Sequence, residues 1–215
     1  FSFSIYPLSY ISNSGIKNPE IEIELIIRAN QLSDAGSSVE RIETKITKIV
    51  KINTDLLLTA RNLYSIGSFE NSGLIPPKVD NETTYTVVMT ATNTSNSISN
   101  ARVVASLPSY VKWMNKIYPS FENVKFSQVG GEIIWEIGDL PAGSGITTSA
   151  KEVSFQISFL PSLSQLGSGP ILVDNIYIEG VDDFTGKKIS YPIKAITTSF
   201  GTDPIYNTGD DKVVY

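Results

Sequence analysis

Two pairs of adjacent aspartates are the residues of this sequence best suited to chemistry. Asp182–Asp183 lies in the stretch GVDDFTGKK, and Asp210–Asp211 lies in GDDKVVY at the end of the chain. Carboxylate oxygens are ligands that Ca²⁺ prefers, so each pair is a candidate calcium site. The first pair, however, stands beside a Thr-Gly hairpin signal, and the second stands in a polar terminal segment. A solvated turn and a terminal tail are the favoured interpretations, and we predict no bound metal or other cofactor.

The chain of 215 residues contains no histidine and no cysteine, which removes most other site chemistry. It lacks the commonest general base near neutral pH, and it lacks thiolate nucleophiles, thiolate metal sites and disulfides. Ser-His-Asp, Cys-His and zinc-histidine sites are therefore excluded. Carboxylate pairs, Ser-Lys pairs and oxygen-only calcium sites remain, and no motif indicates the polar cluster of an active site. We predict that the protein is not an enzyme.

The charge and hydropathy of the chain limit its partners. It carries 17 Lys and Arg against 22 Asp and Glu, with a formal net charge of −5 and no basic block. Nucleic acid is therefore not expected as a partner. No long uncharged apolar run predicts a transmembrane helix, so we expect no membrane insertion of this segment. The sequence begins at Phe1 without a basic and apolar leader, so any signal or anchor is expected to lie outside it.

Alternation of apolar and polar residues predicts β-strands along most of the chain. The pattern is clearest in IEIELIIRA, TTYTVVMTATNTS and EVSFQISFL. One apolar face and one wet face are typical of antiparallel sheets packed as a sandwich. The segment SVERIETKITKIVKINTDLLLTA also fits helical spacing, but its β-branched residues favour one bulged long strand or two strands. The residues expected to face the core are Ile21, Ile23, Leu25, Ile27, Tyr85, Val87, Met89, Ala91, Val153, Phe155, Ile157 and Phe159.

The stretch GSFENSGLIPPKVDNETT is predicted to separate two domains. Its pair Pro76–Pro77 cannot donate ladder hydrogen bonds and favours extended geometry, so we expect a short, stiff hinge. Residues 1–72 are predicted to form a short or incomplete Ig-like β-sandwich, and residues 73–200 a complete Ig-like domain. Residues 201–215 would be a C-terminal tail. The predicted fold class is all-β, with two tandem Ig-like antiparallel β-sandwiches.

Two phrases between residues 75 and 200 carry a resemblance to a known family. The first is the threonine-rich strand and polar turn of TYTVVMTATNTSNSISNARVVASLP, and the second is WEIGDLPAG followed by EVSFQISF. In both phrases the chain resembles the bacterial and archaeal conserved-repeat family known as domain of unknown function eleven. The resemblance implies an Ig-like sandwich of the kind found in surface and secreted proteins, and it implies no particular activity.

The phrase WEIGDLPAG is predicted to be structural rather than catalytic. Trp135 alternates toward the core, and Gly138 lets the backbone leave the ladder. Asp139 is expected to accept hydrogen bonds from backbone N–H groups of the following turn. Leu140 would plug the end of the sandwich, and Pro141 would begin the chain reversal.

These observations together predict a structural or adhesive module of a bacterial cell-surface protein. We expect it outside the cell or at the cell surface, as a spacer and a binding surface for other surface proteins or glycans. One alternative is a filament or surface-layer protomer that assembles by β-strand addition, with FSFSIYPL or DKVVY as the donor. A second alternative is a carbohydrate-binding module that stacks sugars on Tyr110, Tyr118, Phe121 and Phe126.

Overall fold

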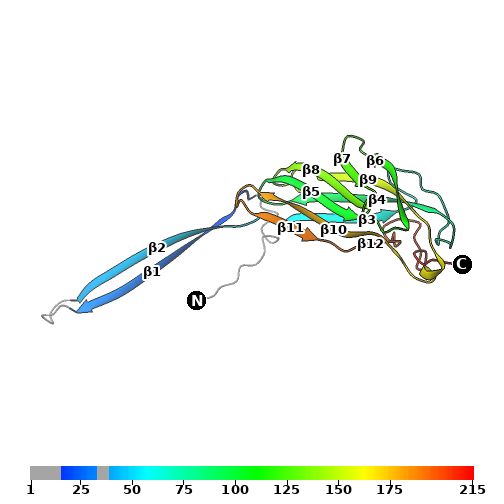
Figure 1. Cartoon of the computed structure of the whole chain (residues 1–215). Helices are drawn as coiled ribbons and strands as arrows, with labels where there is room; N and C mark the ends of the chain where they lie inside the picture. The colour runs from blue at the N-terminus through cyan, green and yellow to red at the C-terminus, as the bar shows by residue number, and fades with distance from the viewer. Residues whose placement is uncertain (1–15, 33–38) are drawn as a thin grey trace.

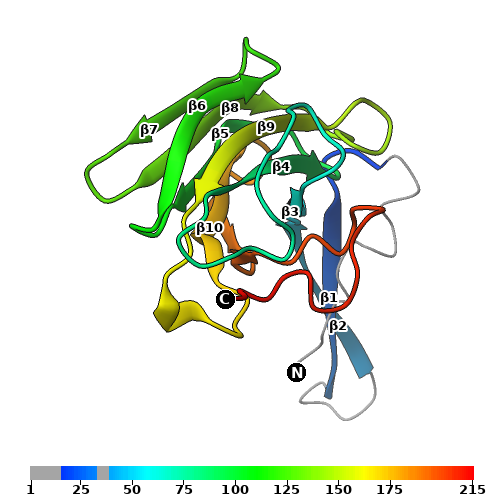
Figure 2. The same ribbon diagram turned by 90° about the vertical axis from the view of Figure 1, so that its right-hand side faces the viewer.

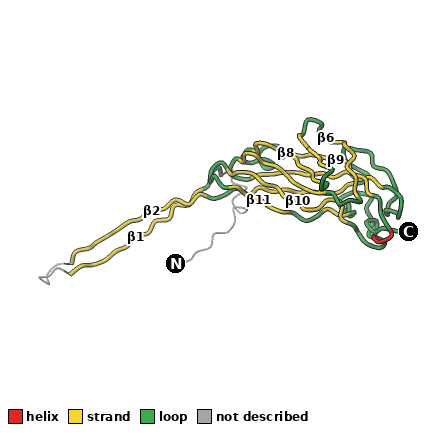
Figure 3. The backbone as a smooth tube through the Cα atoms, viewed as in Figure 1, coloured by secondary structure: helices red, strands yellow, loops and turns green. Residues whose placement is uncertain are grey.

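The computed structural model describes residues 16–32 and 39–215, which form a β-sandwich and a long two-stranded hairpin (Figure 1). The named strands pair antiparallel in both parts. The prediction of an all-β chain with antiparallel sheets is therefore confirmed. A 3-10 helix, η3 (Leu163–Gln165), lies in a connection of the sandwich and is the red segment of Figure 3.

The sandwich consists of two sheets that pack face to face. In the first sheet the spatial order is β3, β4, β9, β6, and in the second it is β11, β10, β5, β8, β7, with β12 also paired to β10. The first order, in which a later strand follows the first two, is typical of Ig-like sandwiches. The first sheet contains β3 (Leu56–Leu63), β4 (Thr83–Asn93), β9 (Lys151–Phe159) and β6 (Val111–Tyr118). The second contains β11 (Lys188–Pro192), β10 (Ile171–Asp182), β5 (Ile98–Ser106), β8 (Glu132–Leu140), β7 (Asn123–Ser127) and β12 (Ile196–Thr197).

One hydrophobic core lies between the two sheets. The alternating residues that we expected inside β4 and β9 are buried there, from Tyr85 to Ala91 and from Val153 to Phe159. Trp135 of β8 is also buried, and its indole Nε1 donates a hydrogen bond of 2.8 Å to Glu122 Oε2. Burial of large aliphatic and aromatic side chains supplies most of the stabilisation of such a sandwich.

The predicted boundary between residues 72 and 73 does not separate two cores. Strand β3 precedes the predicted boundary in sequence. The whole of β3 nevertheless pairs with β4, from Leu56 opposite Asn93 to Leu63 opposite Thr86. Leu56 is fully buried in the same core as Tyr85. The described residues therefore form one sandwich, and no second sandwich precedes it within residues 16–32 and 39–72. The alternation of a strand shows that one face is apolar, but it does not show which sheet the strand joins.

The hairpin, called the arm below, consists of β1 (Glu20–Leu32) and β2 (Val39–Lys51). The two strands pair from Glu20 opposite Lys51 to Leu32 opposite Val39. The arm leaves one end of the sandwich and projects away from it (Figures 1 and 3). The apolar residues of IEIELIIRA, which we predicted to lie in a sandwich core, belong to this arm.

Residues 64–82, called the strap below, cross the outer face of β4 and β9. Asn71 Nδ2 donates to the hydroxyl of Thr86 at 3.0 Å, and Gln156 Nε2 donates to the backbone carbonyl of Glu70 at 2.8 Å. Thr86 and Gln156 are buried although they point away from the core, because the strap covers them. We expected the polar face of β4 and β9 to be exposed to solvent. It is instead the surface on which a loop of the same chain packs.

The pair Pro76–Pro77 lies in the strap and not in a hinge between domains. The carbonyl of Pro77 accepts a hydrogen bond of 2.9 Å from the N–H of Val214, and Val79 N donates to the carbonyl of Val214 at 2.9 Å. The two prolines therefore sit beside the C-terminal segment in the sandwich. The stiffness that we predicted for a linker instead keeps a loop extended along a surface.

The C-terminal segment, residues 201–215, is packed against the sandwich. Val213 is buried, and it exchanges backbone hydrogen bonds of 2.9 Å with Ser168 and 2.8 Å with Gly167. This segment lies at the end of the sandwich away from the arm, and Figure 2 shows it in red from that end. The expectation of a separate tail is therefore not met, because apolar and backbone contacts hold the segment in place.

Candidate interaction surface

The arm has two faces of different chemistry, because cross-strand partners of a hairpin point to the same side. On one side the paired residues are Ile21 with Val50, Ile23 with Lys48, Leu25 with Ile46, Ile27 with Thr44, and Ala29 with Ile42. We call this the apolar face of the arm. The opposite side, called the charged face, pairs Glu20 with Lys51, Glu22 with Ile49, Glu24 with Thr47, Ile26 with Lys45, Arg28 with Glu43, and Asn30 with Arg41.

The apolar face is open to solvent in the middle of the arm. Leu25 and Ile46, which face each other across the two strands, are 49% and 53% exposed. Ile27 is 52% exposed and Ile42 is 46% exposed. Aliphatic side chains exposed side by side along a strand pair are an interaction surface or an aggregation hazard, not an ordinary protein surface.

Ion pairs organise the charged face. Arg28 Nε lies 2.8 Å from Glu43 Oε2, and Lys45 Nζ lies 2.6 Å from Glu24 Oε2. Each pair joins β1 to β2, and all four side chains are substantially exposed. Exposed ion pairs contribute only about 0–1 kcal/mol each, so they define the solvent side of the arm more than they stabilise it.

The base of the arm is attached to the sandwich through backbone and aromatic contacts. The N–H of Ile52 donates to the carbonyl of Pro19 at 2.9 Å, and the N–H of Asn18 donates to the carbonyl of Ser95 at 3.2 Å. Lys51 Nζ lies 4.5 Å from the ring centre of Phe184 and donates to its carbonyl at 3.0 Å. The turn between β10 and β11 is therefore part of the support of the arm.

Asp182 is the main polar anchor at this base. Its side chain is buried and accepts hydrogen bonds from Thr54 N at 2.8 Å, Asn96 Nδ2 at 2.8 Å, Thr185 N at 2.9 Å and Phe184 N at 3.0 Å. Burial raises the pKa of this carboxyl, but the hydrogen bonds from Asn96 and the three backbone N–H groups outweigh burial and lower the pKa. Asp182 is thus an ionised structural acceptor.

Asn93 holds the WEIGDLPAG phrase in place. Its Nδ2 donates to the carbonyls of Asn96 at 2.6 Å and Leu140 at 3.1 Å, and its Oδ1 accepts from Thr54 Oγ1 at 2.6 Å. Leu140 is fully buried, as we predicted for the plug of the sandwich. Asp139, which we expected to bind this turn, is exposed, and the acceptor role falls to backbone carbonyls instead. The sequence signal for Asn93 was only its place at the end of a threonine-rich strand.

The backbone of this phrase behaves only in part as expected. Gly138 has a φ of +78°, a conformation in which glycine avoids the strain of a Cβ atom. We predicted that the backbone leaves the ladder at Gly138, but Gly138 pairs with Ala101 and β8 continues to Leu140, with a shift of register on either side of this pair. Pro141 begins the reversal, because its carbonyl accepts hydrogen bonds from Ser144 N at 3.2 Å and Ser144 Oγ at 2.7 Å. The phrase is therefore structural in each of these positions.

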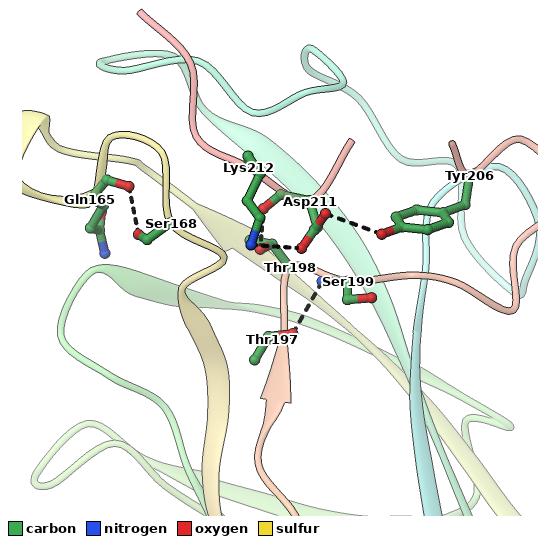
Figure 4. A network of polar contacts seen from close by, with 8 residues as sticks. All are labelled: Gln165, Ser168, Thr197, Thr198, Ser199, Tyr206, Asp211 and Lys212. Atoms are coloured by element: carbon green, nitrogen blue, oxygen red, sulfur yellow. Dashed lines mark hydrogen bonds and ion pairs between the residues drawn. The ribbon is translucent and has the colours of Figure 1, made fainter. Parts of the chain in front are cut away.

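The other calcium candidates are also engaged in turns. Asp183 is exposed, and Asp210 Oδ2 accepts a hydrogen bond of 2.7 Å from Asn207 N. Asp211 accepts from the hydroxyl of Tyr206 at 3.1 Å and lies 3.5 Å from Lys212 Nζ (Figure 4). Within residues 16–32 and 39–215, no group of three or more acidic residues is placed to hold a metal ion. Asp210 is thus held by the backbone and side-chain N–H groups of Asn207, and Asp211 lies beside a hydroxyl and a lysine, which disfavours a cation at this pair.

A hollow of about 560 Å³ lies on the outer face of β5, β8 and β10. Glu179 is nearly buried beside it and binds both Arg102, at 2.7 Å from Nε, and Lys188, at 3.1 Å from Nζ. Burial raises the pKa of Glu179, but Lys188 and Arg102 outweigh that effect and lower it. Glu136 also lines the hollow, so two carboxylates balance its two cations, which leaves little net charge to bind an ionic ligand.

The four aromatic candidates for sugar binding do not form one platform. Tyr110 lies with its ring centre 5.8 Å from that of Phe159, and its hydroxyl donates to the carbonyl of Ile171 at 2.9 Å. Phe126 stacks on Trp113 with ring centres 5.3 Å apart. Tyr118 and Phe121 are exposed, so two of the four side chains are used in packing.

The structure describes only one of the two predicted donor segments for strand addition. DKVVY is engaged with its own sandwich through Val213 and Val214, as described above. FSFSIYPL lies outside the described residues.

In the described part of the chain, no helix has the length and apolar character needed to cross a membrane.

Comparisons with known proteins give distant likenesses only. No protein-family model matches the sequence and no curated protein shows significant similarity to it, so the resemblance to the conserved-repeat family stays a prediction. The chain is similar to the major pilin subunit of Bacillus cereus, with 9% identity and a TM-score of 0.40, over 80% of this chain and 47% of that one.

Two further solved structures show comparable likeness. One is the C-terminal domain of the AgI/II polypeptide BspA of Streptococcus agalactiae, with 10% identity and a TM-score of 0.34, over 82% of this chain and 59% of that one. The other is a GH20 exo-β-N-acetylglucosaminidase of Vibrio harveyi, with 11% identity and a TM-score of 0.38, over 65% and 18%. The chain thus spans less than two thirds of the length of each of these proteins.

Proposed function

We propose that this chain is a non-enzymatic structural module of a bacterial cell-surface protein, in which the sandwich is a spacer and the arm contacts a partner. The observation that carries the proposal is the apolar face of the arm. A two-stranded hairpin by itself is at most marginally stable in water. Its exposed aliphatic face gains free energy when a partner covers it. An arm of this design is therefore best explained as a contact element.

The sandwich suits the role of a spacer because both ends of β3 are held by buried carboxylates. Asp182 accepts from Thr54 N, just before β3, at 2.8 Å. Asp203 accepts from Tyr64 N at 2.8 Å and Ser65 N at 2.7 Å, just after β3. Hydrogen bonds to charged groups contribute more than neutral ones, about 1.5–3 kcal/mol each. Such anchors resist local opening where the arm and the C-terminal segment meet the body.

The surface location is tested by treating intact cells that produce the protein with trypsin and identifying the released peptides by mass spectrometry. Peptides from the arm, which carries Arg28, Lys45 and Lys48, are expected in the supernatant before lysis. An abundant cytoplasmic protein serves as the control and should release none. Arm peptides that appear only after lysis would contradict the proposed location.

A further inference from the structure

We infer that the apolar face of the arm binds the same face of a second copy of this chain, so that two arms form a two-layer, four-stranded structure. The inference rests on the proposed use of the arm as a contact element and names its partner. Leu25 and Ile46 form the central cross-strand pair of each face. They would meet their counterparts at the centre of the interface, as inner faces meet in a sandwich.

The size of the face fits a self-association surface. The apolar face runs from Ile21 to Ala29 on β1 and from Ile42 to Val50 on β2. At ~3.3 Å per residue the face is roughly 30 Å long, and two strands with their side chains make it roughly 10 Å wide. Two such faces bury about 600 Å² in flat projection, and side-chain relief brings the accessible area toward the ~1,000 Å² at which specific interfaces begin. The apolar face of the arm is thus at the lower size limit for a dimer interface without the sandwich.

The chemistry of the face favours another protein face over a lipid surface. It is built from isoleucine, leucine, valine and alanine, with Thr44 and Lys48 as its polar members. It carries no tryptophan, tyrosine or phenylalanine, the residues that anchor amphipathic segments at a membrane interface. β-Branched aliphatic side chains on two packed strand pairs interdigitate well. A second identical face is therefore a suitable cover.

The two copies are expected to lie antiparallel, with the sandwiches at opposite ends. Packed sheets lie about 10 Å apart, whereas each sandwich is itself two sheets thick, so parallel arms would bring the two bodies into collision. Lys48 and Thr44 lie two residues on either side of Ile46 on β2. Antiparallel packing about Ile46 places each Lys48 over the partner's Thr44 and keeps the two ammonium groups at different levels along the arm.

The charged face would stay in water in this arrangement. The pairs Arg28–Glu43 and Lys45–Glu24 both lie on the side away from the interface. Only the apolar side is desolvated, so no ion pair has to be broken or buried on association. The two sides of the arm thus have separate roles, and this separation allows a matched test.

The first experiment measures the mass of the full chain by size-exclusion chromatography with light scattering over a range of concentrations. Ile46 and Ile49 lie on the same strand with exposures of 53% and 57%, but on opposite faces. We expect the unchanged chain and Ile49→Lys to have twice the 23.5 kDa mass of one chain, and Ile46→Lys to have the single mass. All three should melt alike by circular dichroism, because neither side chain lies in the sandwich core.

The second experiment uses the absence of cysteine from the chain. Ile46→Cys introduces one thiol at the expected twofold axis, and Ile49→Cys introduces one on the charged face. Under an added thiol oxidant, Ile46→Cys should give a disulfide-linked dimer on a non-reducing gel, and Ile49→Cys should remain monomeric. Equal cross-linking of the two variants would overturn the face-to-face arrangement.

Two further outcomes would overturn the inference. One is an unchanged chain that stays monomeric at the highest concentration. The other is binding to lipid, measured by flotation with vesicles of phosphatidylcholine and phosphatidylglycerol. If the unchanged chain and Ile49→Lys float with the vesicles and Ile46→Lys does not, the apolar face binds lipid instead of a second copy. Neither outcome changes the result expected from the trypsin experiment on cells. The proposed dimer and the proposed surface location can therefore fail independently of each other.

Discussion

The carboxylate of Asp182 accepts a hydrogen bond of 2.8 Å from the backbone N–H of Thr54, which is 128 residues away in sequence. Thr54 connects the arm to the first strand of the sandwich, and Asp182 ends β10. The same carboxylate also holds Asn96, so three separate parts of the chain meet at one buried anion. The position of the arm therefore depends on a residue that looked like a solvated turn aspartate.

Replacement of Asp182 by asparagine should destabilise the protein. Asparagine presents an NH₂ group toward the N–H donors of Thr54, Phe184 and Thr185, so at least one buried donor loses its acceptor. An unsatisfied buried donor costs about 1–3 kcal/mol. The free energy of unfolding is measured in urea, with Asp183→Asn as the control because Asp183 is exposed. Equal stability of the two variants would show that the Asp182 anchor is not needed.

The protein should lose stability in acid through Asp182 and Asp203. Burial raises the pKa of both carboxyls, but the hydrogen bonds that they accept outweigh it and lower the pKa in the folded state. Their contribution is complete above the unfolded-state pKa, about 3.9, and is lost as the pH falls through the lower folded-state value. Melting temperatures are measured from pH 6 to pH 2. Asp182→Asn should lose fewer degrees over this range than the unchanged chain.

Tyr85→Phe should increase the stability of the protein. The Tyr85 hydroxyl is buried and has no hydrogen-bond partner among the described residues. Removing an unsatisfied buried hydroxyl recovers a desolvation cost of about 1–3 kcal/mol. Tyr110→Phe is the matched variant, because its hydroxyl donates to the carbonyl of Ile171 at 2.9 Å, and it should be neutral or destabilising. A stability change of the opposite sign for Tyr85→Phe would mean that its hydroxyl is satisfied in solution.

The sandwich should fold without the arm but not without β3. A chain of residues 53–215 keeps β3 and Thr54, whereas a chain of residues 75–215 lacks β3 and most of the strap. The shorter chain loses the buried side chains of Leu56, Leu58 and Leu63 and leaves one edge of β4 unpaired. Heat denaturation followed by circular dichroism should show a cooperative transition for residues 53–215 only. A cooperative transition of residues 75–215 would restore the two-domain prediction.

Local patterns predicted the strands well because they report the two faces of a strand. The alternation of TTYTVVMTATNTS and EVSFQISFL placed Tyr85 and Phe155 in a core, and the structure buries both. The same reasoning placed Leu25 in a core, yet it is 49% exposed on the arm. The pattern has the same form in both cases, because a strand carries one apolar face whether the partner is its own chain or another surface.

The sequence by itself determined the all-β character, the antiparallel pairing, the burial of Trp135 and the structural nature of WEIGDLPAG. These properties follow from side-chain alternation and turn chemistry within about ten residues. Only the tertiary structure decided that β3 joins β4, that Pro76–Pro77 lies in a strap, and that β1 and β2 stand apart as an arm. Pairing and covering are contacts between distant segments, and their free energy depends on which surfaces meet rather than on the residues of either segment alone.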